Sequence, residues 1–568
     1  MTLIQWIIFF LILQVVHFLG TWKLYQKAGF KAWEAAVPVY NAVILMKIIN
    51  RSKWWVILLF IPIVNLIMFP VIWVETLRSF GKNTTVDTLL GIFTLGFYIY
   101  FINYFVDVKY VENRSLVART KTGDTVSSIL FAIVVATIVH TYFIQPFNIP
   151  TGSLEKTLLV GDFLLVSKNH FGARTPMTAV AAPMVHDTIP VLNQKSYLSK
   201  PQIPYFRFPG FESVKKNDIV VFNWPVDTVY KFFDKSGRAA VTKPIDKKSN
   251  YVKRCVATPG DIFSIKDGFV FINGKELQLS ERAKPQYFHT VYASKGIPGA
   301  ALQATGSTEF TRNFNVRPAN QQQIDAMQPY VLNASQNPDG SYLVMTGSQG
   351  FPPSVRATGL YAEELSQNIT EINLTLDGAK QLRENKAIDS VVKFNITNPA
   401  KDKVFPQDGK WTGDNYGPIT IPEKGATVQL NAENIALYKR LISAYENHDL
   451  KVNGNEIRID GKIVNEYTFE QDYYFMVGDN RHRSEDSRYW GFVPADHIVG
   501  KPVFIFWSVD PNVPWSKAFD KIRWDRLFTT VGGSGEPFSY FWIFVVLLGG
   551  YFIADFVIKR KKKRASKY

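Results

Sequence analysis

The chain has 568 residues, too many for a single domain, and a formal net charge of +16 at pH 7, which would suit nucleic acid or a membrane surface. Much of its lysine and arginine flanks apolar runs, a pattern that indicates membrane topology and argues against a nucleic-acid partner. The one cysteine, Cys255, excludes an intrachain disulfide, so the soluble part must be stabilised by its own core.

Five apolar runs are each about long enough to cross a bilayer. They cover residues 4–20, 54–77, 86–106, 124–145 and 537–558. The first run has no recognisable cleavage site, so it is predicted to be a retained helix and not a removed signal peptide. The stretch 36–46 is also apolar but is interrupted by Pro38 and Asn41, which favours an interfacial or re-entrant segment.

Positive charge predicts how these runs are oriented. The loops 21–53 and 107–122 and the tail 559–568 are rich in Lys and Arg, so we expect all three in the cytoplasm. Five spans then place the N-terminus and the region 146–536 outside the cytoplasm.

Residues 146–536 have the pattern of a mostly antiparallel β domain, because short β-prone runs alternate with Gly, Pro and Asn turns. These runs are 162–166, 218–222, 268–272, 473–477 and 502–507. Asn273-Gly274 and Asp460-Gly461 are hairpin-turn signals. Residues 276–470 are more polar and are interpreted as an inserted subdomain with limited helical signal, for example at 431–447.

The first segment that could carry chemistry runs from Ile149 to Asp162 and contains Gly152-Ser153. Glycine lets the backbone turn sharply, which can push the Ser153 hydroxyl out of the path of the chain. Taken alone, a loop serine that caps a turn is the simpler interpretation.

The second segment runs from Tyr251 to Asp261, and Lys253 lies within its apolar, strand-like part. In a strand, Tyr251, Lys253 and Cys255 share a face. An exposed strand lysine is the simpler interpretation. A lysine that acts as a base would have to be buried, because burial can lower its pKa from about 10.4 by up to roughly 3–5 units.

The third segment, Gly478 to Pro494, is dense in polar groups and follows an apolar run. Asp486 and Arg488 could form a charge-assisted pair there. By composition alone, a solvated loop explains the segment equally well.

Together and in this order, the three segments resemble the motifs of the type I signal peptidases, or leader peptidases. The matching residues are Pro150-Thr-Gly-Ser-Leu, Asp218-Ile-Val-Val-Phe, Tyr251-Val-Lys-Arg, Gly478-Asp-Asn-Arg, Ser484 and Asp486-Ser-Arg-Tyr-Trp-Gly-Phe-Val-Pro. The resemblance covers roughly 124–275 and 470–510. It departs at Thr151, which replaces a frequent Ser, at Leu154, where Met is common, and at Lys156, where the family usually has Pro.

The resemblance implies a membrane-bound serine endopeptidase that removes N-terminal signal peptides from exported preproteins and cuts after small residues. It assigns Ser153 as the nucleophile and Lys253 as its general base. It implies that Ser484 holds the lysine amine and that the Thr151 hydroxyl, with the Ser153 backbone N–H, stabilises the oxyanion.

Further residues are expected to support this site or to line its substrate pocket. The supporting residues are Asp479, Asp486 and Arg488, and the pocket residues are Phe147, Ile149, Leu158, Tyr251 and Val252. The resemblance implies no cofactor and no metal. The expected partners are preproteins and membrane phospholipid, with the export machinery as a further candidate.

The sequence pattern and the family resemblance together predict a multi-span α-helical membrane anchor plus a mostly antiparallel β catalytic domain with a large insertion. The resemblance places it in the bacterial inner membrane, with the catalytic domain on the periplasmic side. The predicted division is 1–123 for a multi-span region, 124–145 for the anchor, 146–275 and 471–536 for the catalytic domain, 276–470 for the insertion, 537–558 for a last helix and 559–568 for a basic tail.

Other interpretations stay open. A Ser-His-Asp triad lacks a recognisable signature, since His140 lies in an apolar run and His482 has no role in the family motifs. Cys255 lies in the lysine motif, not in the nucleophile motif. The main alternative function is a catalytically inactive, peptidase-like membrane scaffold or binding module.

Two further alternatives fit the chain less well. A soluble, DNA-binding Ser/Lys self-cleaving regulator would not have five apolar runs, and a solute transporter would need intramembrane charges. Residues 28–41 and Phe80-Gly-Lys82 also resemble a small uncharacterised membrane family, which implies no activity.

Overall fold

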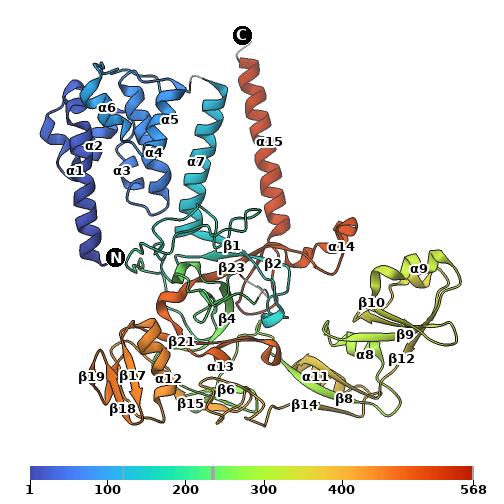
Figure 1. Cartoon of the computed structure of the whole chain (residues 1–568). Helices are drawn as coiled ribbons and strands as arrows, with labels where there is room; N and C mark the ends of the chain where they lie inside the picture. Colours follow the sequence, from blue (N-terminus) through green and yellow to red (C-terminus); the bar gives the residue numbers. More distant parts are fainter. Residues whose placement is uncertain (119, 232–236, 566–568) are drawn as a thin grey trace.

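Three long helices rise from one side of a β-rich body in the computed structural model (Figure 1). They are α1 (Leu3–Lys27), α7 (Lys121–Tyr142) and α15 (Phe541–Ala565). Each contains a stretch that is long and apolar enough to cross a membrane. The structure describes residues 1–118, 120–231 and 237–565. Arg119 and residues 566–568, parts of the predicted cytoplasmic segments, lie outside the described residues.

The run 54–77 is not one spanning helix, so this part of the prediction is wrong. It forms two helices, α3 (Trp55–Leu58) and α4 (Val64–Ser79). Between them Pro62 has no N–H to continue the helix, and Ile63 takes a φ of +69°. The helix is therefore interrupted where apolar composition alone suggested a continuous one.

The run 86–106 is also interrupted. It divides into α5 (Thr85–Phe93) and α6 (Tyr98–Phe105), whose axes are bent by 116° at a turn through Gly96. Among the described residues, three helices can span a membrane, or four if this bent pair counts as one span. The apolar runs predict five.

The shorter N-terminal helices pack around α1. The predicted interfacial stretch forms α2 (Tyr40–Ile48), which shares a core with Leu24 and Tyr25 of α1. A buried carboxylate, Glu75 of α4, accepts hydrogen bonds from Arg51 and Arg114, at 3.0 and 2.6 Å. These contacts tie α4 to the loop between α2 and α3 and to the segment between α6 and α7.

An antiparallel sheet forms the centre of the β body, with strand order β1-β2-β23-β3-β4-β21-β22. The strands are β1 (Ile144–Asn148), β2 (Asp162–Ser167), β23 (Ile498–Ser508), β3 (Ile219–Asn223), β4 (Asn250–Ala257), β21 (Tyr473–Val477) and β22 (Val493–Pro494), with β24 (Thr529–Thr530) beside β23. β1 follows α7 almost directly, so the helix and the sheet edge are joined (Figure 1).

A second sheet, in the order β15-β5-β6-β7, packs against the first. Its strands are β5 (Ile262–Lys266), β6 (Phe269–Ile272), β7 (Lys275–Glu276) and β15 (Tyr416–Thr420). Phe263 and Tyr416 share a core with Phe475 of β21. The expected hairpin turn is present, because Asn273 and Gly274 both have positive φ, at +51° and +79°, as a type I′ turn needs.

The remaining strands form smaller sheets. They are β8 (Gln286–Tyr292), β13 (Ile369–Thr375) and β14 (Ser390–Lys393) in one; β9 (Thr311–Arg317), β10 (Val331–Gln336), β11 (Tyr342–Gly347) and β12 (Tyr361–Leu365) in another; β16 (Thr427–Gln429) and β20 (Glu466–Thr468); and β17 (Leu450–Asn453), β18 (Glu456–Ile459) and β19 (Lys462–Ile463). The hairpin predicted at Asp460-Gly461 joins β18 to β19.

Short helices accompany these sheets. They are α8 (Gly299–Ala304), α9 (Gln321–Met327), α10 (Pro353–Arg356), α11 (Leu376–Arg383), α12 (Ile435–Arg440), α13 (Ser487–Trp490) and α14 (Ala518–Lys521). The helix expected at 431–447 is thus present in part, and it continues as a π-turn over Leu441–Tyr445. The β8 and β9 sheets each have a core of their own, and in Figure 1 the β9 sheet extends away from the central sheet.

Candidate active site

Ser153 lies on a tight turn between β1 and β2. After β1 the chain forms one turn of 3-10 helix, Gly152–Leu154, which leaves the serine 8% exposed. The turn is held from outside by Asn480, whose backbone N–H donates to the Ser153 carbonyl at 3.0 Å and whose Nδ2 donates to the Gly152 carbonyl at 2.9 Å. The Ser153 turn is therefore fixed by a segment more than 300 residues away in sequence.

Lys253 reaches this turn from β4. Its Nζ lies 2.6 Å from Ser153 Oγ, within hydrogen-bond distance, and the lysine is only 3% exposed. Burial lowers the pKa of Lys253 to about 8, and the nearby charges of Asp486 and Glu485 partly oppose this shift. A neutral amine beside a serine hydroxyl can accept its proton.

The predicted orienting residues lie near this pair without contacting the lysine amine. Thr151, two residues before the serine, is extended and exposed. Ser484 is buried beside Gly478, where an added Cβ would lie 2.2 Å from Ser484 Oγ and 2.6 Å from the Ser153 carbonyl oxygen. Ser484 Oγ forms no hydrogen bond with Lys253 in this structure, so its orienting role stays a prediction.

Two buried ion pairs lie next to the site. Asp479 accepts hydrogen bonds from Arg254 Nε and Nη2 at 2.7 and 2.6 Å, and from Thr157 Oγ1 at 2.6 Å. Asp486 and Arg488 form the charge-assisted pair expected from their sequence, at 2.9 Å. Asp486 also accepts the Gly478 N–H at 3.0 Å, which anchors the start of the last motif.

Four of the five predicted pocket residues gather in one apolar cluster. Ile149 and Leu158 are buried in it, and Phe147 and Val252 pack against it. Tyr251 belongs to a different cluster, where its ring stacks on Trp224 with centroids 5.0 Å apart. On β4 it alternates with Val252, and so the two side chains face opposite sides of the sheet.

Cys255 is poorly suited to act as a nucleophile. It is fully buried in the same cluster as Tyr474 and Met476. Burial raises the pKa of its thiol well above the ordinary value. A thiol of this kind stays protonated, and its environment is that of a small apolar residue.

Sequence reasoning missed contacts that come from residues 276–470. Asn373 donates to Asn480 Oδ1 at 2.7 Å and to Glu309 at 2.9 Å. Lys156, at the position where the family usually has proline, donates from its amine to the Gly306 carbonyl. Asn480 belongs to the Gly478-Asp-Asn-Arg motif, but no local sequence signal marks Gly306, Glu309 or Asn373.

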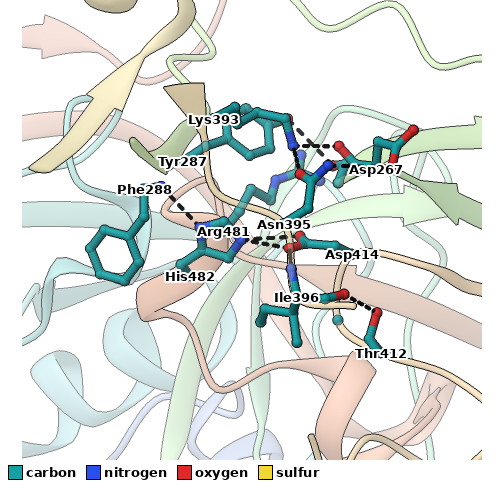
Figure 2. A network of polar contacts seen from close by, with 12 residues as sticks. Asp267, Tyr287, Phe288, Lys393, Asn395, Ile396, Thr412, Asp414, Arg481 and His482 are labelled. Carbon is teal, nitrogen blue, oxygen red and sulfur yellow. Dashed lines mark hydrogen bonds and ion pairs between the residues drawn. The ribbon is translucent and has the colours of Figure 1, made fainter. Parts of the chain in front are cut away.

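His482, which has no role in the family motifs, lies in a polar network shown in Figure 2. Its Nδ1 accepts the Phe288 N–H at 2.9 Å, so the proton is on Nε2, which donates to Asp414 at 2.9 Å. Asp414 also accepts the Ile396 N–H at 2.7 Å. The network joins the last motif to β8 and to the segment before β15, and it does not reach Ser153.

A serine hydroxyl in contact with a buried lysine, in a β domain that follows an apolar helix, is the arrangement of a membrane-anchored serine endopeptidase. The chain belongs to the signal peptidase family, peptidase S26, whose family model matches residues 122–349 and 418–507. The match extends beyond the motif segments into 276–349 and 418–470. Residues 33–113 match a second model, a family of unknown function (DUF5684).

Curated relatives agree with this assignment. Signal peptidase I of Haemophilus influenzae is 24% identical over 434 residues, which cover 74% of this chain and 79% of the relative. Signal peptidase I of Buchnera aphidicola is 20% identical over 420 residues, covering 72% of this chain and 86% of the relative. Signal peptidase I of Helicobacter pylori is 32% identical over 125 residues, which cover 20% of this chain and 42% of the relative.

Proposed function

We propose that this serine endopeptidase removes N-terminal signal peptides from exported preproteins, with Ser153 as nucleophile and Lys253 as general base. The observation that carries the proposal is the 2.6 Å contact between Lys253 Nζ and Ser153 Oγ, made by a lysine that is almost fully buried. Family membership and the names of the relatives supply the substrate class.

In the first step the neutral Lys253 amine accepts the Ser153 proton while Oγ attacks the scissile carbonyl carbon. The resulting ammonium then donates this proton to the leaving amine, and an acyl-enzyme remains. In the second step Lys253 accepts a proton from water, which attacks the ester carbon. The bond to Oγ breaks, Lys253 returns the proton to Ser153 Oγ, and the signal peptide leaves with a free carboxyl terminus. The buried pairs Arg254–Asp479 and Asp486–Arg488 keep the surrounding backbone in place.

The oxyanion would be stabilised by the Ser153 backbone N–H and the Thr151 hydroxyl. In the hydrogen bonds of the described residues, the Ser153 N–H is not used by another group, and Thr151 is exposed at the start of the turn. Loss of one oxyanion donor typically costs about 10²–10³ in rate.

Two sheet edges are suited to hold an extended substrate. β1 is the end strand of its sheet, and residues 250–253 of β4 pair with β3 but not with β21, which reaches only 254–257. A peptide strand can add to such edges through main-chain hydrogen bonds. The apolar side chains around Phe147, Ile149 and Val252 would leave room for small substrate residues only.

The described structure supports the expected topology through three helix ends. Trp6 of α1 donates to the Gln202 carbonyl of the β body at 3.0 Å, α7 leads into β1, and α15 begins beside the same body (Figure 1). The N-terminus and the β body then share a side, which is the periplasmic side if the basic segments are cytoplasmic. This topology does not require 54–77 and 86–106 to cross the membrane. If both turn back as re-entrant hairpins, α1 and α7 are the two spans before the β body, and α7 still leads from the cytoplasmic side to the periplasmic side.

Exposed aromatic residues mark the surface that would meet the membrane. Phe208 packs on Tyr142 at the end of α7, and Phe211, nearby in sequence, is 80% exposed. At the start of α15, Trp524 packs on Phe541 and on the exposed Phe519. Amphipathic Trp and Tyr rings, such as those of Trp524 and Tyr142, are enriched at membrane interfaces. The proposal also includes a multi-pass chain in the bacterial inner membrane that contacts phospholipid. It keeps the predicted division at 1–123, 124–145, 146–275, 276–470, 471–536, 537–558 and 559–568.

The direct test is cleavage of a purified reporter preprotein by the full chain in detergent. Ser153→Ala and Lys253→Met should each abolish cleavage, while Cys255→Ala should retain it. Retained fold is checked by thermal unfolding of each variant. An active Ser153→Ala enzyme would rule out the serine mechanism, and an inactive wild type that still binds preprotein would favour the scaffold alternative.

A further inference from the structure

A cavity at the end of α7 has two lysines and an arginine in its lining. It has a volume of about 120 Å³ and lies between the last turns of α7, the turn at Ile63 and segments 168–186 and 245–247 of the β body. Among the described residues that line it, the titratable ones are Lys168, Arg174, Lys247, His140, His186 and Asp246. A space of this size holds several waters or one phosphate group.

The two lysines are buried without an acidic partner. Lys168 is 7% exposed, and its Nζ donates to Gln145 Oε1 at 2.6 Å. Lys247 is 5% exposed, and its Nζ lies 3.4 Å from the Val185 carbonyl oxygen. Neither amine forms an ion pair with a carboxylate in the part of the chain that the structure describes. Each therefore has N–H donors left for a further partner.

The nearest carboxylates are engaged elsewhere. Asp246 accepts hydrogen bonds from the Met177 N–H at 3.1 Å, the Thr178 N–H at 3.0 Å and the Thr178 hydroxyl at 2.7 Å. Asp187 forms ion pairs with Lys195 and Lys243, at 2.7 and 3.5 Å. Asp496, whose charge acts on Arg174, lies with its carboxylate 2.6 Å from His497 Nδ1. These carboxylates reduce the positive charge of Lys168, Lys247 and Arg174, but none of them forms an ion pair with these cations among the described residues.

Arg174 adds a third cation, and its guanidinium donates to the Asp496 carbonyl and to Asn223 Oδ1 at 2.5 and 2.7 Å, both uncharged acceptors. The end of α7 contributes about half a negative charge, which offsets only part of the excess. Burial, together with the Arg174 and Arg207 charges, lowers the pKa of Lys168 well below its ordinary range. An anion in the cavity would remove this penalty on the charged lysine.

We propose that this cavity is a binding site for a phosphate-bearing anion, held by Lys168 and Lys247 with Arg174 beside them. The group can come from the headgroup of an anionic phospholipid or from inorganic phosphate. The position of the cavity at the end of an apolar helix places it at the depth of lipid headgroups. This inference rests on the proposed membrane anchoring but is independent of the Ser153–Lys253 pair, so its test reads binding and not cleavage.

The test measures the melting temperature of the full chain in neutral detergent during titration with three additives. They are phosphatidylglycerol, phosphatidylcholine and inorganic phosphate at matched ionic strength. Phosphatidylglycerol should raise the melting temperature of the wild type by roughly 3–8 °C at saturation, because a ligand that binds only the folded state stabilises it. Phosphatidylcholine should not.

The variant Lys168→Met/Lys247→Met should lose this shift or need at least tenfold more lipid to show it. The matched control is Lys200→Met, which removes an exposed charge two residues from Gln202, the contact of α1, and should behave as the wild type. The additive-free melting temperature shows whether each variant folds. If the double variant does not fold, Lys247→Gln alone should weaken the response at least threefold.

The outcomes separate the sources of the anion. A shift caused by inorganic phosphate alone, and lost in the double variant, supports the site with free phosphate as its ligand. A shift caused only by phosphatidylglycerol and lost in the variant supports a lipid headgroup. A wild-type shift in the double variant, or an equal shift with phosphatidylcholine, overturns the proposal.

Discussion

Asn480 holds the Ser153 turn at two points, through its backbone N–H to the Ser153 carbonyl and through Nδ2 to the Gly152 carbonyl. Its Oδ1 in turn accepts from Asn373. The nucleophile turn is thus connected through one asparagine to the region 276–470. We therefore expect Asn480 to influence the rate although it is not one of the proposed reacting groups.

Asn480→Ala should lower kcat by roughly 10–100-fold with little change in KM, because a displacement of the nucleophile by a fraction of an ångström is costly. It should also destabilise the fold by about 1–3 kcal/mol, since a buried carbonyl loses its donor. Steady-state kinetics on the reporter preprotein and thermal unfolding measure the two effects. Asn373→Ala, which leaves the Gly152 hydrogen bond intact, is the control and should lower kcat less than Asn480→Ala does.

The rate should depend on pH through Lys253. The base must be neutral, and burial lowers its pKa to about 8 from the ordinary 10.5. We therefore expect kcat/KM to rise about tenfold per pH unit below roughly pH 8 and to level off above it. A profile whose rising limb extends to pH 10 would show that Lys253 keeps its ordinary pKa and would contradict the mechanism.

The same shift has a consequence for stability. Between about pH 8 and 10.5 the unfolded lysine binds a proton that the folded lysine has lost, so this residue makes stability rise with pH in that window. Below pH 8 the lysine is protonated in both states, and burial of its charge destabilises the folded state by on the order of 3 kcal/mol. Lys253→Met removes this cost. We expect it to melt at the same or a higher temperature than the wild type at pH 7, although it is inactive.

The buried Arg254–Asp479 pair should be sensitive to the loss of one partner. Asp479→Ala leaves the Arg254 guanidinium buried and unpaired, which typically costs about 3–5 kcal/mol. The double variant Arg254→Met/Asp479→Ala removes both charges and should recover part of that loss. Chemical unfolding of the single and double variants gives the coupling energy. If the losses in unfolding free energy of the two single variants simply add up in the double variant, the interaction between Arg254 and Asp479 contributes little to stability.

The local chemistry of the site could be predicted from the sequence because its parts are short motifs. The Ser153 turn, the Lys253 strand and the Asp486–Arg488 pair each lie within a few residues of chain. Strand positions and both hairpin turns also followed from periodicity and from Asn-Gly and Asp-Gly signals. The contact between Ser153 and Lys253, 100 residues apart, came only from the family resemblance.

Other features could not be predicted because they depend on contacts distant in sequence. Lys253 becomes buried only when the last motif packs over β4, and nothing in its own strand shows this. The break in the run 54–77 is different, because it is local: Pro62 marks it in the sequence, but the prediction relied on the apolar composition on either side. Gly306 and Glu309 reach the nucleophile turn from a polar region that has no matching motif.

Lys156 offers a test of the last point, because the family resemblance implies proline at its position. Its φ is +70°, whereas the proline ring fixes φ near −65°, so the family residue does not fit this turn. Lys156→Pro should therefore disturb the Ser153 turn and reduce kcat by at least tenfold. Lys156→Gly is the matched control, since glycine accepts positive φ and loses only the contact between the amine and the Gly306 carbonyl. A wild-type rate in Lys156→Gly, combined with a slow Lys156→Pro enzyme, would assign the effect to the backbone, whereas equal losses would assign it to the Gly306 contact.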